Sequence, residues 1–277
     1  MKKVALPFGL IFACCMSVFS NDNRRIVAIH PFSGNQEITT VLEDKISNEL
    51  LKLNRVVLVN RKRQAAETPQ QTQAFATANT LGEFGKQMGA THVLNGIVAR
   101  ANIRDRSTAK KQEWTAQITV ELSVIDVKTG RILSQAALST SQKGRTKEEA
   151  LDKVVNNIVP RTLPFLRNSF PIEGRITQVN ESVNSKGITE IKDLLVNLGT
   201  IHSMRKKMVL DVFEEVTIRD GGEDKILENF AGQIRVKEVK GENFSLCTII
   251  GKPRAAMQGF FTHPENFIAR TPKERVR

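Results

Sequence analysis

The chain has 277 residues, a mass of 30.9 kDa and a formal net charge of +12, with 41 Lys and Arg against 29 Asp and Glu. This length suits two domains of ordinary size or one large domain, and we expect two. The chain has 14 Phe, one Trp and no Tyr, and its basic residues are dispersed, so we do not expect a nucleic-acid platform of stacked aromatic side chains.

The first twenty residues have the features of an export signal. Lys2 and Lys3 begin the segment, residues 4–19 are largely apolar, and Val18 and Ser20 lie where a signal peptidase reads small side chains. No later run approaches the roughly 20 apolar residues of a membrane-spanning helix. We therefore expect residues 1–20 to be a signal peptide. Its removal lowers the net charge from +12 to +10 and delivers the mature protein to the periplasm, either free or attached to the outer membrane.

The cysteines leave two ways of processing the amino terminus open. Cleavage after Ser20 would remove Cys14 and Cys15 and leave Cys247 without a disulfide partner. The stretch "LIFAC", which ends at Cys14, instead resembles a lipobox, the signal that directs a diacylglycerol onto its cysteine, although bulky Phe12 departs from that pattern. Cys247 lies in an apolar stretch, and we expect a small core residue and not a nucleophile.

Five strands are predicted in the first half of the chain from β-branched and alternating runs. They cover residues 24–32, 55–61, 90–103, 114–126 and 132–139. The last two form a hairpin, in which Gly130 tolerates the positive φ of the turn. Asp126 is expected to cap this turn and not to perform chemistry.

Helices are predicted between these strands and after the last one. Apolar residues at intervals of three and four predict the first helix over residues 38–53, and a polar connection over residues 64–79 precedes the second. The second and third helices open with capping-box spacings, Thr80 with Glu83 and Thr146 with Glu149. Gly89 can close the second helix, and Pro160 and Pro164 are expected to bend or end the third.

The resulting order, βαβαβββα, predicts an α+β protein whose first domain is one mixed sheet with packed helices. After Phe170 the pattern changes to short strands separated by Gly, Asn and Asp turns, which is typical of a small all-β barrel or sandwich. The expected domains are residues 24–170 and residues 171–258, and we expect residues 259–277 to be a partly ordered tail.

The first domain resembles the family that includes the curli secretion channel, the lipoprotein activators of penicillin-binding proteins and the amino-terminal domain of TolB. The resemblance spans residues 24–170 and is carried by "RIVAIHPF", "LEDKISNELLKL", "VVLVNRKRQ", "GATHVLNGIV" and "VELSVIDVKTGRILSQ". It implies that the hairpin is a structural signature of the fold. The second domain is more weakly similar to the carboxy-terminal module of the flagellar assembly protein FlgT, through "GRITQV", "VNLG", "VFEEV" and "GQIRVKEV".

The sequence departs from the channel branch of that family. A secretion pore of this type needs two long amphipathic hairpins in each subunit, with roughly ten alternating residues in each strand. The segment after the third strand carries Arg100, Arg104, Arg106 and Lys110, and the segment after Leu138 is polar throughout. Neither could face lipid at low cost, so a pore is disfavoured.

Reactive residue types do not form a recognisable constellation. The four histidines, His30, His92, His202 and His263, fall in separate predicted elements without the short spacing of metal ligands. The carboxylates on the predicted helices are those of solvated faces, and the stretch Asp220–Lys225 is a turn that lacks the order of a phosphate-binding loop. We therefore expect no catalytic site, no cofactor and no metal.

The favoured hypothesis is a non-enzymatic envelope protein that binds a protein partner, which the basic charge suggests is acidic, in the assembly of an envelope or surface structure. We expect this protein to contact the membrane only through a lipid anchor on Cys14. Whether it forms a homo-oligomer is left open by the sequence. The candidate partner-binding residues are Arg61, Lys62, Arg63, Arg104, Arg106, Lys110 and Lys111. Two alternatives remain, a subunit of a ring-forming outer-membrane secretion complex and an exported hydrolase whose site is assembled from distant residues.

Overall fold

The computed structural model describes residues 24–59, 77–183, 185, 187, 189–251, 259 and 263–275. The predicted signal peptide, the predicted lipidation site Cys14, the basic cluster Arg61, Lys62 and Arg63, and nearly all of the polar connection lie outside these residues. In the part of the chain that is described, no helix has the length and apolar character needed to cross a bilayer.

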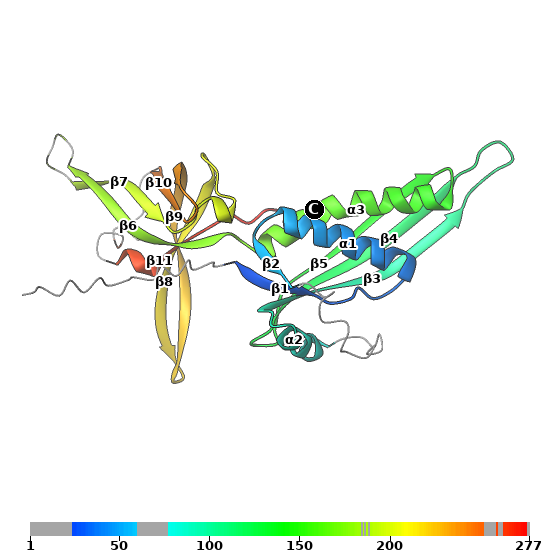
Figure 1. The fold of residues 1–277 in the computed structure, drawn as a ribbon, viewed down its shortest axis with the longest axis horizontal. Helices are drawn as coiled ribbons and strands as arrows, with labels where there is room; N and C mark the ends of the chain where they lie inside the picture. Colours follow the sequence, from blue (N-terminus) through cyan, green and yellow to red (C-terminus); the bar gives the residue numbers. More distant parts are fainter. Residues whose placement is uncertain are drawn as a thin grey trace, which may run out of the picture.

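The first domain is a five-stranded mixed sheet with three helices (Figure 1). Its strands lie in the order β2-β1-β3-β4-β5; β1 is parallel to β2 and β3, while β3, β4 and β5 are antiparallel. The elements are β1 (Arg25–Ile29), α1 (Gln36–Lys52), β2 (Val56–Leu58), α2 (Ala78–Gln87), β3 (His92–Asp105), β4 (Trp114–Asp126), β5 (Ile132–Gly144) and α3 (Lys147–Ser169). The predicted order βαβαβββα and the α+β class are confirmed.

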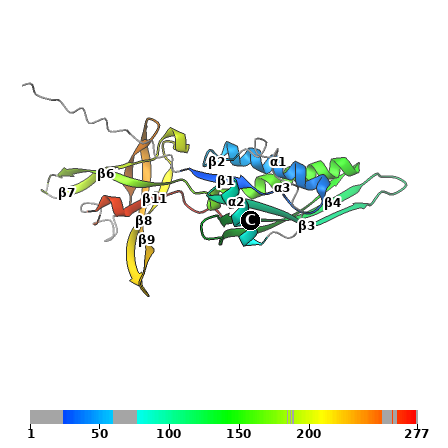
Figure 2. The same ribbon diagram turned by 60° about the horizontal axis from the view of Figure 1, so that its bottom comes forward.

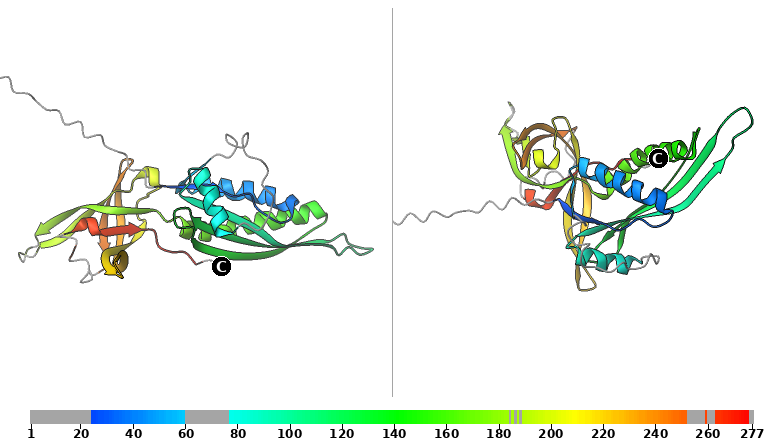
Figure 3. Two further views of the ribbon diagram at one scale, coloured as in Figure 1. Left: turned by 90° about the horizontal axis from the view of Figure 1, so that it is seen from below. Right: turned by 45° about the vertical axis from the view of Figure 1, so that its right-hand side comes forward.

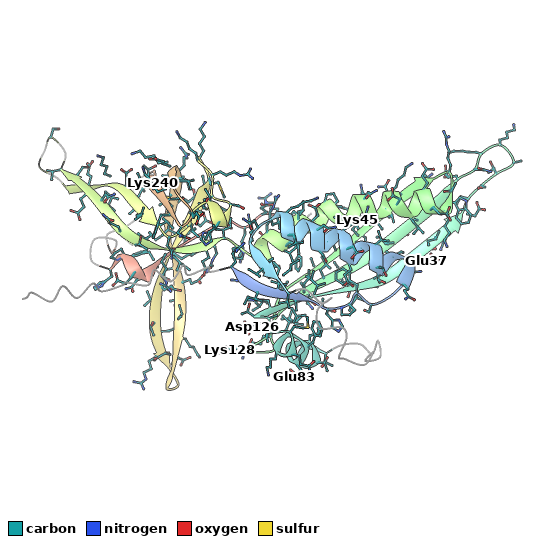
Figure 4. All side chains as sticks on the ribbon, in the orientation of Figure 1. Glu37, Lys45, Glu83, Asp126, Lys128 and Lys240 are labelled. Atoms are coloured by element: carbon teal, nitrogen blue, oxygen red, sulfur yellow. The ribbon has the colours of Figure 1, made fainter. Side chains whose placement is uncertain are left out.

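Helices α1 and α3 cover one face of the sheet, and α2 covers one end of the other face (Figures 1 and 2). The main core therefore lies between the sheet and the two long helices, where Ile38, Leu42 and Ile46 of α1 are fully buried. These residues recur at intervals of four, which places them on one helix face. Figure 4 shows Glu37 and Lys45 along α1, where they form ion pairs with Lys147 (3.1 Å) and Asp152 (3.8 Å) of α3.

The hairpin between β4 and β5 turns where the sequence predicted. Asp126 Oδ1 accepts hydrogen bonds from the backbone N–H (2.7 Å) and the hydroxyl (2.8 Å) of Thr129. Gly130 has a φ of 65°, a conformation that costs glycine little. Figure 4 places Asp126 and Lys128 beside α2, so the turn packs at the end of the domain and has a structural role.

Helix α3 starts as predicted and continues further. Thr146 Oγ1 accepts from Glu149 N (3.1 Å), and Glu149 Oε2 in turn accepts from Arg145 N (2.6 Å). Pro160 and Pro164 do not end the helix, which runs to Ser169. The sequence left bending and ending open, and the structure excludes ending, because the helix face on both sides of the prolines is buried, with Ile158 fully covered and Phe165 nearly so. Tertiary burial thus offsets the hydrogen bonds that proline cannot make.

The second domain is an antiparallel sheet of six strands that closes on itself as a ring, in the order β10-β7-β6-β11-β8-β9. The strands are β6 (Glu173–Val183), β7 (Thr189–Val196), β8 (Val209–Asp220), β9 (Glu223–Lys240), β10 (Phe244–Ile250) and β11 (Phe267–Arg270). Two short helical turns, η2 (Thr200–His202) and η4 (Pro264–Asn266), connect them. This pairing confirms a small all-β domain and matches the closed one of the two predicted alternatives.

We expected residues 259–277 to form a partly ordered tail, but residues 267–270 form a strand of the ring domain. Strand β11 pairs with both β6 and β8 and closes the ring, with Phe267, Ile268 and Ala269 buried. The four residues are too few to show a strand period, and their partners lie far away in the sequence. For this reason the local pattern did not reveal the strand.

The end of α3 is held by hydrogen bonds from the edge of the mixed sheet within the first domain. Arg25 Nη1 donates to Ser169 O (2.9 Å), and Arg55 Nη1 donates to Arg167 O (3.1 Å). One further hydrogen bond reaches the ring domain, because Asn54, which follows α1, donates from Nδ2 to Ile201 O (3.0 Å). The Asn54 contact therefore ties the first domain to the ring.

The end of the described chain runs back from β11 to α3, as Figure 3 shows. Glu274 N donates to Asn168 Oδ1 (2.7 Å), and Asn168 Nδ2 donates to Glu274 O (2.6 Å). The Glu274 carboxylate also pairs with Arg167 (3.1 Å). The carboxy-terminal segment is therefore a second tie between the domains.

Cys247 should be unreactive in the folded protein. It is completely buried in the core of the ring domain, and burial raises the pKa of its thiol to about 12. At pH 8 only about one thiol in ten thousand would then be a reactive thiolate. We expect no alkylation of Cys247 by iodoacetamide in native buffer and complete alkylation in guanidinium chloride, read by peptide mass. Rapid labelling of the native protein would contradict this burial.

His92 should make the fold sensitive to acid. Burial lowers the pKa of its imidazole to about 4, and the nearby Arg25 acts in the same direction. An unfolded histidine titrates near pH 6.5, so the stability present above about pH 6.5 is lost progressively as the pH falls toward 4. The His92→Phe variant, which keeps a ring against Phe170, should reduce this loss in urea unfolding between pH 7 and pH 4. The His263→Gln variant, changed at an exposed position, should behave as wild type.

Candidate partner-binding surface

A site among the described residues could consist of metal ligands, a cavity or an exposed charged surface. No group of three or more His, Cys, Asp or Glu side chains among them could hold a metal ion. A hollow between the domains, lined in part by Arg24, Asn54 and His202, measures about 20 Å³, which is room for about one water molecule. We therefore considered the exposed surfaces as sites of protein binding.

The tip of the β3–β4 hairpin projects beyond the helices that cover the sheet (Figure 1). Its backbone is tied across the turn, because Arg106 N donates to Glu113 O (2.7 Å) and Thr108 N donates to Lys111 O (2.8 Å). Asp105 Oδ1 also accepts from Ser107 N (2.8 Å). The tip, defined here as residues 104–113, is thus a folded turn that carries exposed side chains.

Charges in the tip are only partly compensated. Glu113 pairs with Lys111 and with Lys143 of β5 (2.7 Å), and hydrogen bonds from these two lysines lower the pKa of its carboxyl to about 2. Within the described residues, Arg104, Arg106 and Lys110 form no ion pair, and all three are exposed. These three cations are available to an acidic partner.

The structure brings together four of the seven residues that the sequence proposed. Arg104, Arg106, Lys110 and Lys111 lie within the single tip. The other three, Arg61, Lys62 and Arg63, lie outside the described residues, so their part in such a surface stays a prediction.

An open sheet face adjoins the tip, and sequence reasoning did not identify it. The side chains of β3, β4 and β5 that point away from α1 and α3 form rows across the three strands. Beyond the end that α2 covers, these rows are Asn95–Ser123–Gln135, Ile97–Glu121–Ala137, Arg100–Thr119–Ser139, Asn102–Gln117–Ser141 and Arg104–Thr115–Lys143. The face is mostly small and polar, and its last row leads directly into the tip.

A shallow hollow of about 230 Å³ lies in this face, over the first two rows. Its lining includes Asn95, Ile97, Ser123 and Ala137. Asn95 is buried, at 7% exposure, although none of the described helices packs on this part of the face. The hollow is large enough to receive one or two side chains of a partner, and Glu121 is the charged residue in its lining.

The alternation of apolar and polar residues in β4 indicated that one face of the sheet is polar. Glu121 and Ser123 were recognised as pointing away from Val120 and Leu122, but the sequence does not show how far a helix covers the polar side. That depends on where the ten-residue α2 packs, which is a tertiary property.

Several solved structures are similar to the first half of the chain at low scores. Lipoprotein GNA1162 from Neisseria meningitidis is 11% identical, with a TM-score of 0.37, over 50% of this chain and 98% of that chain. A PelC dodecamer from Paraburkholderia phytofirmans is 16% identical, with a TM-score of 0.33, over 50% and 86%. The LpoB carboxy-terminal domain from Escherichia coli is 16% identical, with a TM-score of 0.30, over 43% and 83%. At these scores we draw no argument from the likenesses.

Sequence comparison gives one family and no curated relative. No curated protein matches this chain. A family model does match, over residues 18–136, which include β1 to β4 and the start of β5. The match does not reach the ring domain, so the resemblance of residues 171–258 to the flagellar module has no support. Over residues 18–136 the chain is similar to the family described as peptidoglycan-synthase activator LpoB, which agrees with the resemblance of its sequence to a family that includes activators of penicillin-binding proteins.

Proposed function

We propose that this protein is a non-enzymatic component of the cell envelope that binds a peptidoglycan synthase and activates it. The family match over residues 18–136 carries the proposal, because the description of that family names an activator of such a synthase. The predicted export signal is consistent with an envelope location. We further propose that the protein lies in the periplasm and is held at the outer membrane through a lipid on Cys14.

The binding surface that we propose consists of the tip and the open sheet face. The two are continuous, since Arg104 and Lys143 belong to both the last row of the face and the charged end of the hairpin. Three uncompensated cations would set the orientation of an acidic partner, and the hollow near Asn95 would receive its side chains. Arg61, Lys62 and Arg63 are proposed as an additional contact.

The chain would then consist of two working parts. We propose a partner-binding domain over residues 24–170 and a ring domain that begins at residue 171 and includes β11, in place of the boundary first expected at residue 258. For the alternative of an exported hydrolase, the described residues contain no group of three or more His, Cys, Asp or Glu side chains that could hold a catalytic metal ion. A ring-forming subunit would give large symmetric particles, which the mass of the purified protein in light scattering would reveal.

Reversing the charge of the tip should weaken synthase binding. Changing Arg104, Arg106 and Lys110 to Glu replaces three attractive charges by three repulsive ones, and we expect a loss of affinity of at least about tenfold, mostly through slower association. The affinity for each purified penicillin-binding protein of the same organism and the rate of glycan polymerisation would be measured. The matched control changes Arg205, Lys206 and Arg235 of the ring domain to Glu. If both triple variants bind as wild type, the tip is not a contact.

Filling the hollow should also weaken binding, by a steric route that does not depend on salt. Ala137 is exposed and lines the hollow, so Ala137→Arg should leave the melting temperature nearly unchanged and reduce synthase binding at low and high salt alike. Val41→Arg is the control, because Val41 is 44% exposed on α1, on the other side of the same sheet. Full activation by the Ala137→Arg variant would exclude the open face from the interface.

A further inference from the structure

We propose that the ring domain carries a docking surface for an anionic phospholipid bilayer, formed by Arg205, Lys206, Lys207, Arg235 and Lys237. This set is called the basic patch below. The proposal rests on the proposed attachment of the protein to a membrane, and it adds a second contact with that membrane besides the lipid.

The backbone brings the five residues of the basic patch together. The turn that contains Arg205 and Lys206 pairs with β9, because Lys207 N donates to Val236 O (2.8 Å) and Val236 N donates to Met208 O (2.8 Å). Val236 points into the core of the ring, so its neighbours Arg235 and Lys237 point outward beside the turn.

Most of this charge is uncompensated. Lys237 pairs with Asp193 (3.0 Å), whereas within the described residues Arg205, Lys206, Lys207 and Arg235 form no ion pair and are exposed. The other acids nearby do little to offset them. Glu238 already pairs with Lys240 (2.7 Å), and Asp211 accepts a hydrogen bond from Gln233 Nε2 (2.9 Å). Glu242 is exposed, and its carbonyl accepts from Ile201 N (3.2 Å).

The place where the described chain begins argues for a membrane as the occupant. Arg24 Nη1 donates to Asn54 Oδ1 (3.0 Å), and Asn54 Nδ2 donates to Ile201 O, so the chain enters the fold next to η2. Figures 1 and 2 show η2, coloured yellow, beside β2. The basic turn begins three residues after η2.

The length of the preceding chain keeps this surface near an anchor. Arg24 lies ten residue steps after Cys14, and an extended chain spans at most about 3.6 Å per step. A lipid on Cys14 would therefore hold Arg24 within about 36 Å of the bilayer. The basic patch, next to that entry point, is the nearby surface with the charge that an anionic bilayer attracts.

Vesicle binding by the exported protein with Cys14→Ala tests the proposal, because no acyl chain then contributes. We expect it to sediment with vesicles of phosphatidylcholine and phosphatidylglycerol (3:1) and not with phosphatidylcholine alone. Each basic residue near such a surface contributes about a fivefold gain, so Arg205→Glu, Lys206→Glu and Arg235→Glu together should reduce binding by more than about tenfold. About 0.5 M NaCl should release the unchanged protein.

The control carries the same change of charge at the other end of the molecule. Arg104→Glu, Arg106→Glu and Lys110→Glu should leave vesicle binding within about twofold of the unchanged protein. An equal loss in both triple variants, or equal binding to neutral vesicles, would overturn the proposal. Normal synthase activation by the ring variant together with lost vesicle binding separates this surface from the proposed function. The three Glu changes can be repeated as Gln if they lower the melting temperature.

Discussion

The rest of the structure depends on how the helices cover the mixed sheet: two long helices, α1 and α3, cover one face, and of the described helices only the short α2 packs on the other. Ile38, Leu42 and Ile46 of α1 and the buried side of α3 fill that face completely. Each fully buried aliphatic side chain contributes roughly 1.5–3 kcal/mol, so this layer fixes the register of every strand beneath it. The alternate side chains must then point to the opposite face. There α2 is short and leaves most of β3, β4 and β5 open to a partner.

The length of β3 separates the tip from the domain junction. His92, at the start of β3, contacts the ring of Phe170 at the domain junction, and Asp105, at the end of the same strand, lies in the tip. Thirteen residue steps at about 3.3 Å place the tip roughly 40 Å from the junction. The basic patch lies on the ring side of that junction. The two basic surfaces are therefore too far apart to serve one small ligand and suit two different binding events.

Much of the first domain could be predicted from sequence because its signals are local. The apolar spacing of α1, the Thr146 cap and the turn at Asp126 each depend on residues within one or two turns of chain, and the structure contains all three. The features that depend on residues distant in sequence were not predicted. Strand β11 has four residues whose partners are distant in sequence, and α3 passes through two prolines because tertiary burial outweighs their local cost.

The candidate surfaces likewise divide into one that local sequence predicts and two that depend on strand pairing. The tip could be predicted, because its basic residues are close in sequence and a hairpin must expose its turn. The open face and the basic patch could not, since Asn95 meets Gln135 only across three paired strands and Arg235 meets Lys206 only through the pairing of β9 with a turn. Arg205, Lys206 and Lys207 are consecutive in the sequence, but Arg235 and Lys237 join them only in the fold.

Two ties between the domains, from Asn54 to Ile201 O and from the carboxy-terminal segment at Glu274 to Asn168, give the two ends a fixed relation. Within the first domain, Arg25 and Arg55 donate to carbonyls at the end of α3, where four backbone C=O groups have no partner within the helix. Glu274 binds the same helix end from the carboxy-terminal side. Arginine suits this position because its charge also opposes the negative end of the helix dipole. A ring domain held at a bilayer would thus hold α3, and with it the strands beneath α3, at a set angle to that surface. The tip lies at the far end of those strands, so the same contacts that close the helix would direct the partner-binding surface away from the membrane.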